Sequence, residues 1–272
     1  MSREHAPAVS QAVPADLQAA LAGARPRLGP FGQDLRFFTS VGSTNDVADR
    51  LALDGAAEGT TIVADTQTAG RGRLGRTWYS PPGAGLYASV VLRPGSTPSP
   101  ALWTLVAGVG LADALRRVSG LNVLVKWPND LVIGRKKVCG ILAEGSASQG
   151  SIRHVVLGFG VNLRPAAYPA DFADRATSLE GELGRPVDRG IVLAGSLEAL
   201  ADRIEEARAS GIGAILDRWR ALAPSSIGSQ VEWRSPDGIR RGTTAGIDGD
   251  GALLVTAGGA VERIIGGEVR WM

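Results

Sequence analysis

The feature that most constrains this chain is a seven-residue stretch at positions 70–76, Gly-Arg-Gly-Arg-Leu-Gly-Arg. Its three glycines permit positive φ angles and carry no Cβ, so the backbone can approach a ligand closely. Its three arginines supply rigid N–H donors that suit phosphate and carboxylate groups. The stretch therefore predicts a loop that wraps an anionic small molecule. An RG-type nucleic-acid segment and an ordinary solvated turn are the alternatives.

Composition narrows the class of protein. The chain has 272 residues, of which 44% are hydrophobic, which is enough for a packed core in one or two domains. Lys and Arg total 29 against 27 for Asp and Glu, and this near balance does not indicate a dedicated nucleic-acid binder. The single cysteine, Cys139, excludes an intrachain disulfide framework and fits a cytoplasmic location. We expect neither a secretory signal nor a membrane span.

The pattern along the chain predicts three parts. Residues 1–34 read as a disordered or weakly helical segment with one short helix over 16–24. Residues 35–223 mix strands with long amphipathic helices over 101–118, 188–208 and 211–222, while residues 163–185 read as a loop. Short β-rich runs and turns fill residues 224–272. The predicted fold class is α+β: a mixed β-sheet domain with flanking helices and a small C-terminal SH3-like β-barrel.

Two sets of polar residues lie on or beside a predicted β-hairpin. Sheet alternation places either Lys136 or Lys137 inward, where a lysine could neutralise a carboxylate and a phosphate together. A solvated edge-strand lysine is the alternative. Lys126, Asn129 and Asp130 surround a strand end, a common place for ligand-binding residues, although Pro-Asn-Asp is also ordinary turn chemistry.

Other candidate residues are individually weak. Ser43 with Asp46 matches a capping box at the start of a helix, and such a helix end also attracts anions. Gln67 carries an amide that suits a ureido or amide ligand, and Asn162 closes a strand that contains glycines. With two histidines and one cysteine, a zinc site or a Cys–His couple is unsupported, and neither G-x-S-x-G nor a Walker A pattern occurs.

Five blocks taken in order resemble the biotin–protein ligases. They are Gly42-Ser43-Thr44-Asn45, then residues 67–78 with the arginine stretch, then Lys126-Trp127-Pro128-Asn129-Asp130, then residues 137–142, then Gly158-Phe159-Gly160-Val161-Asn162. The blocks cover about residues 35–165, and the β-rich tail is similar to that family's small C-terminal domain. The resemblance is to the monofunctional form, which lacks a DNA-binding domain.

The resemblance implies a two-step reaction. Biotin's carboxylate attacks the α-phosphorus of ATP to give biotinyl-5′-adenylate and pyrophosphate, with Mg²⁺ on the triphosphate. A lysine of a biotin carboxyl carrier protein domain then takes the biotinyl group and releases AMP. By the same resemblance, residues 35–223 form the catalytic biotin- and ATP-binding domain, and the chain is expected to be a monomer or homodimer with no DNA or membrane partner.

The resemblance also assigns residue roles, with the metal ligands left open. Lys137 and Arg73 are the expected catalytic residues. The expected biotin-binding residues are Ser43, Thr44, Asn45, Gln67, Gly70, Arg71, Gly72, Arg73, Lys137 and Gly140. The expected ATP- and adenylate-binding residues are Arg71, Arg73, Lys126, Asn129, Asp130, Lys137 and Asn162. Lipoate–protein ligase activity is the alternative enzyme, and an RG-loop nucleic-acid binder is the alternative of another class.

Overall fold

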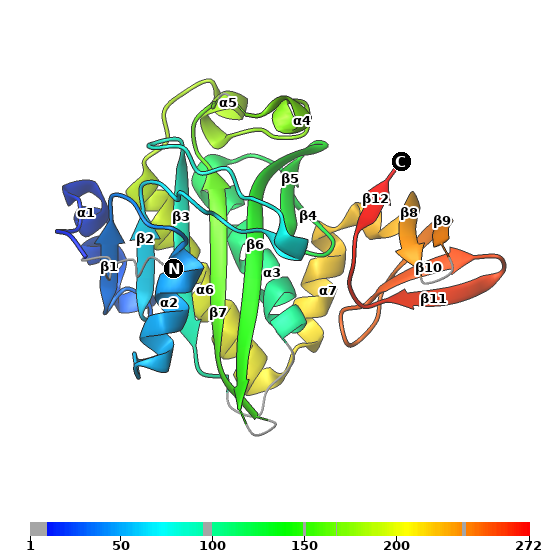
Figure 1. Ribbon diagram of the computed structural model, residues 1–272, viewed down its shortest axis with the longest axis horizontal. Helices are drawn as coiled ribbons and strands as arrows, with labels where there is room; N and C mark the ends of the chain where they lie inside the picture. The colour runs from blue at the N-terminus through cyan, green and yellow to red at the C-terminus, as the bar shows by residue number, and fades with distance from the viewer. Residues whose placement is uncertain (1–9, 95–99, 149–150, 167, 236–237) are drawn as a thin grey trace, which may run out of the picture.

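A seven-stranded mixed sheet forms the centre of the large domain (Figure 1). The computed structural model describes residues 10–94, 100–148, 151–166, 168–235 and 238–272. The strand order is β1-β2-β3-β7-β6-β5-β4, in which β1 and β2 are parallel and the other neighbours are antiparallel. These strands are β1 (Leu35–Phe38), β2 (Thr61–Ala64), β3 (Gly85–Leu92), β4 (Val123–Lys126), β5 (Asp130–Ile133), β6 (Lys136–Ser148) and β7 (Ser151–Asn162).

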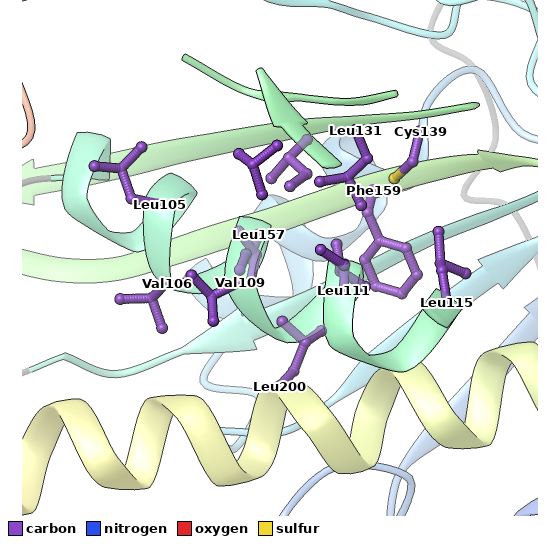
Figure 2. Packing of buried hydrophobic residues seen from close by; sticks show 14 of the residues in the cluster. Leu105, Val106, Val109, Leu111, Leu115, Leu131, Cys139, Leu157, Phe159 and Leu200 are labelled. Carbon is purple, nitrogen blue, oxygen red and sulfur yellow. The ribbon is translucent and has the colours of Figure 1, made fainter. Parts of the chain in front are cut away.

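One face of the sheet is covered by the long helix α3 (Pro100–Ser119), as its apolar spacing predicted. Val106, Val109 and Leu111 of this helix meet Leu157 and Phe159 of β7 (Figure 2). Two further helices, α6 (Arg189–Ser210) and α7 (Gly213–Leu222), pack against α3 from outside. The sheet is therefore backed by α3, which is itself covered by α6 and α7.

The opposite face carries helix α2 (Thr44–Leu53). Ile62 and Ala64 of β2 belong to the apolar cluster under α2, whereas Val63 between them belongs to the main core. Successive side chains of a strand point to opposite faces, so a strand buried on both faces shows an unbroken apolar run. Helix α2 contacts β2, β3 and β7, and the cavity described below lies beside it.

The N-terminal segment is folded onto the large domain over its described residues. The helix expected at 16–24 is present as α1 (Ala15–Ala24), and Leu17 and Leu21 are buried where α1 packs on α6. The backbone N–H of Gln11 donates to the carbonyl of Phe37. A 3₁₀ turn, η1 (Arg25–Arg27), follows α1. Residues 1–9, which were also expected to be disordered, lie outside the described residues.

The C-terminal part forms a five-stranded antiparallel sheet in the order β11-β10-β9-β8-β12. After the turn η3 (Pro224–Ser226), its strands are β8 (Ile227–Ser235), β9 (Gly238–Ile247), β10 (Leu253–Ala257), β11 (Ala260–Ile264) and β12 (Val269–Trp271). The indole N–H of Trp127 donates to the carbonyl of Gly251 at 3.0 Å, which joins the two sheets beside the site.

The region 163–185, expected to be loop, contains two very short helices, α4 (Ala170–Ala173) and α5 (Leu179–Leu183). Segments of four and five residues are too short to show helical periodicity in a sequence. Within the described residues, the helices are all too short or too polar to cross a membrane.

Candidate functional site

A cavity of about 760 Å³ lies on the front face of the large sheet, beside α2. The arginine loop, residues 70–76, crosses in front of β7 and β6 and forms one wall (cyan in Figure 1). Residues of the predicted set line this cavity with the exception of Gly70, which lines an adjoining cavity of about 590 Å³ under the same loop. The structure therefore gathers the five sequence blocks around one space.

The arginine loop is a tight reversal that closes on itself. The N–H of Gly72 donates to the carbonyl of Arg76 at 2.7 Å, and the N–H of Trp78 donates to the carbonyl of Gly70 at 2.8 Å. At the tip, Leu74 has φ +57° and Gly75 has φ +71°, so two successive residues adopt the left-handed conformation. A leucine is uncommon there, and its side chain is exposed.

Glycines in the sheet make room for the indole of Trp78. Gly140 and Gly160 are cross-strand partners on β6 and β7. A Cβ on Gly140 would lie 2.6 Å from Trp78 Cζ3, and one on Gly160 would lie 2.5 Å from Trp78 Nε1. Such distances are far below normal contact, so any side chain at either position would displace the indole. The indole of Trp78 can therefore lie against the sheet only because Gly140 and Gly160 have no side chain. Its buried Nε1 has no hydrogen-bond partner among the described residues.

Lys137 points into the cavity and Lys136 is exposed, which settles the choice that alternation left open. The Lys137 ammonium lies 2.5 Å from Asp130 Oδ1 and 4.9 Å from the centre of the Trp78 ring. A cation over an indole is held by the ring quadrupole. Lys137 is thus a localised positive charge in the cavity wall, positioned by one acid and one aromatic ring.

A second cation, Lys126, lies where the C-terminal sheet closes the cavity. Its ammonium is 4.8 Å from the ring centre of Trp271 on β12. Burial lowers the pKa of Lys126; Asp130 opposes this shift, and Lys137 lowers the pKa further. Burial likewise lowers the pKa of Arg73, which also lines the cavity. An entering anion would relieve the repulsion among these cations.

The other end of the cavity is a neutral polar network. Gln67 Oε1 accepts from the N–H and the hydroxyl of Thr44, and Gln67 Nε2 donates to Ser80 Oγ at 3.0 Å. Ser89 Oγ lies 2.8 Å from Thr44 Oγ1 and donates to Asn45 Oδ1 at 2.6 Å. These side chains are largely buried, and their amide and hydroxyl groups are of the types that pair with a ureido or amide group.

The capping box expected at α2 is not formed. Ser43 occupies the N-cap position, but its side chain makes no capping hydrogen bond. Gln67 takes that role by accepting from the N–H of Thr44. Asp46 turns away from the helix end and pairs with Arg71. Sequence could not find this arrangement because the capping group lies 23 residues further along the chain.

Two of the expected ATP-binding residues, Asn129 and Asn162, use their side-chain N–H groups to donate to backbone carbonyls. Asn129 Nδ2 donates to the carbonyl of Ile141 at 2.7 Å. Asn162 Nδ2 donates to the carbonyl of Thr177 at 2.9 Å and thereby holds the segment after α4. Both residues line the cavity, but the hydrogen bonds of their amides position the neighbouring chain.

Sequence reasoning gave no role to several cavity residues. Trp78 ends the stretch of residues 67–78, and an aromatic residue directly after the loop was the available signal for it. The segment around α4 contributes Tyr168, Phe172 and Arg175, and β12 contributes Arg270 and Trp271. No local pattern marks these residues, because they reach the site only through the tertiary fold.

The fold and site suit a class of protein that takes up a polar, anionic small molecule beneath an arginine loop. Residues 37–162 match the model of the Biotin/lipoate A/B protein ligase family, and residues 226–270 match that of the Biotin protein ligase C terminal domain. The chain belongs to the biotin protein ligase family.

Individual relatives agree with this membership. The chain is 36% identical to a biotin–[acetyl-CoA-carboxylase] ligase of Paracoccus denitrificans over 222 residues, which are 78% of this chain and 90% of the relative. It is 35% identical to the bifunctional ligase/repressor BirA of Bacillus subtilis, over 88% of this chain and 74% of that protein. Among solved structures, the biotin protein ligase of Aquifex aeolicus in complex with biotin and ATP superposes with a TM-score of 0.77, at 29% identity, over 88% of this chain and 100% of that one.

Proposed function

We propose that this chain activates biotin with ATP to biotinyl-5′-adenylate and transfers the biotinyl group to a lysine of a biotin carboxyl carrier protein domain. Family membership supports the activity. One observation supports the proposal that the cavity is the site of the reaction. Lys137 stands in a single cavity that holds a neutral polar network around Thr44 and Gln67 as well as the cationic region around Lys126. The first end suits the ureido ring of biotin and the second suits phosphates.

In the first step, two anions must approach each other. A carboxylate oxygen of biotin attacks the α-phosphorus of ATP, and the bond from that phosphorus to the bridging oxygen of pyrophosphate breaks. Lys137 and Arg73 are proposed to stabilise the charge on the carboxylate and the α-phosphate. Since the residues offer charge and position rather than a nucleophile, the enzyme acts by alignment and neutralisation.

In the second step, the ε-amine of the carrier lysine attacks the carbonyl carbon of the adenylate. The C–O bond of the mixed anhydride breaks, AMP leaves, and the amine loses its proton. The arginine loop is proposed to cover the adenylate between the steps, which limits its hydrolysis by water. The expected biotin residues Ser43, Asn45 and Gly140 belong to this proposal as walls of the cavity.

Mg²⁺ is proposed to enter with ATP. Among the described residues, no group of three His, Cys, Asp or Glu side chains could hold a metal ion. Mg²⁺ characteristically binds through substrate phosphates with one or two carboxylates, and Asp130 in the cavity wall fits that mode. Bound there, the ion would neutralise phosphate charge.

Pyrophosphate release tests the proposal and separates it from lipoate activation. The protein is incubated with ATP and Mg²⁺ and either biotin or lipoate. We expect biotin-dependent pyrophosphate and none with lipoate. The match of residues 226–270 to the Biotin protein ligase C terminal domain supports biotin. Pyrophosphate with lipoate alone would replace this proposal by the alternative enzyme.

A further inference from the structure

The side chain of Arg71 is held by carboxylates from two other elements. Its Nη2 lies 2.6 Å from Asp46 Oδ1, in the first turn of α2, and 2.8 Å from Glu144 Oε2 on β6. Two carboxylates around one guanidinium leave a local net negative charge. In this arrangement Arg71 therefore offers little attraction to an anionic ligand.

Glu144 is itself oriented by the floor of the cavity. Asn45 Nδ2 donates to the same oxygen, Glu144 Oε2, at 2.7 Å. Asn45 is buried, and its Oδ1 accepts from Ser89. A Cβ at Gly158 would lie 2.0 Å from Asn45 Oδ1, so a glycine in β7 makes the position of Asn45 possible. A continuous set of polar contacts thus runs from the cavity floor to the loop.

The strength of these contacts suits a loop that must open. The side chains of Arg71, Asp46 and Glu144 are 43%, 54% and 38% exposed. Ion pairs between half-exposed groups are individually weak. They can bias the loop toward its closed position without preventing the entry of a ligand.

We propose, on the basis of the proposed function, that Asp46 and Glu144 form a carboxylate clasp for Arg71 that holds the arginine loop over the cavity. Glu144 is then a positioning residue, which acts through Arg71 and is itself aligned by Asn45. Arg71 contributes by closing the loop, and its direct contact with biotin or the adenylate is secondary. The clasp retains the adenylate between the two steps.

A double-mutant cycle tests the clasp. The variants are Arg71→Gln, Glu144→Gln and the double variant, with Asp217→Asn as the control because Asp217 forms an exposed ion pair on α7 with Arg220. Two quantities are measured: hydrogen exchange of the amides in 70–78 without ligands, and the rate at which biotinyl-5′-adenylate already formed on the enzyme hydrolyses to AMP without a carrier. We expect Glu144→Gln to raise both by about two- to fivefold. The double variant should match Arg71→Gln alone, and the control should match the native protein.

Three outcomes would overturn the clasp. Unchanged exchange in Glu144→Gln would show that this carboxylate does not hold the loop. If the fold-change in the double variant equals the product of the two single fold-changes, Arg71 and Glu144 act independently. That result is expected if Arg71 acts by direct contact with the ligand. If AMP formation without a carrier rises as much in the Asp217→Asn control as in Glu144→Gln, the effect follows from the loss of any surface ion pair. Absence of biotin-dependent pyrophosphate in the native protein would refute the proposed function instead, and the exchange cycle would still test the clasp.

Discussion

Replacement of Lys137 by alanine probes the charge on which the chemistry depends. The ammonium lies 2.5 Å from Asp130 Oδ1 and faces the cavity, so Lys137→Ala removes a cation and leaves that carboxylate unpaired. Two unit charges 4 Å apart interact by about 4 kcal/mol at the effective dielectric constant of ~20 that is typical near a protein surface. Loss of one stabilising donor in an enzyme site costs about 2.7–4 kcal/mol. At about 1.4 kcal/mol for each tenfold change, adenylate formation should slow by about 10²–10³-fold.

Biotin-dependent pyrophosphate release at saturating ATP is the assay, and Lys136→Ala is the matched control. Lys136 is the neighbouring residue on β6 but is exposed, so its loss should leave turnover within about twofold. The circular dichroism spectrum should stay unchanged in both variants. Near-normal turnover in Lys137→Ala, or equal losses in the two variants, would refute the role given to Lys137.

Three further outcomes follow from the structure. Gly160→Ala should raise the KM for biotin about tenfold and cost about 1–3 kcal/mol of unfolding free energy, because its Cβ would lie 2.5 Å from Trp78 Nε1; an unchanged KM would contradict this. Arg208 donates to Glu58 at 2.6 and 2.7 Å. Burial raises the pKa of Glu58, but the hydrogen bonds from Arg208 and from the backbone N–H of Arg93, together with the charges of both arginines, outweigh it and hold that pKa below its ordinary value. The resulting stability is present above the unfolded pKa of the carboxyl and is lost as pH falls through the folded pKa. Glu58→Gln should therefore lower the unfolding free energy by about 1–2 kcal/mol at pH 7, with a smaller difference in denaturant titrations near pH 3. Hydrogen exchange in 70–78 should slow when biotin and ATP are added, and equal rates with and without them would contradict closure of the loop.

Much of the architecture could be predicted from the sequence because the long elements carry strong periodic signals. The apolar spacing of residues 101–118 predicted α3, and the hairpin at 131–144 was recognisable from its turn. The sequence could not decide whether Lys136 or Lys137 points inward, and the reason is physical. The register between β5 and β6 shifts after Leu131, so strict alternation along β6 fails near Lys137.

Contacts between distant segments account for what the sequence could not predict. Gly158 and Gly160 lie in the glycine-containing strand that Asn162 closes, and the side chains that approach them are those of Asn45 and Trp78, from distant segments. The wall formed by β12 reaches the cavity from the C-terminal sheet, more than 100 residues from Lys137. Such partners depend on the packed fold, which no local pattern specifies.

Transfer of biotin to a carrier domain tests the central claim most directly. The protein is mixed with ATP, Mg²⁺, biotin and a biotin carboxyl carrier protein domain, and the intact mass of the carrier is measured. We expect a gain of one biotinyl group on a single lysine, dependent on ATP and lost in Lys137→Ala. A carrier that keeps its original mass while the protein is folded and binds biotin would contradict the account.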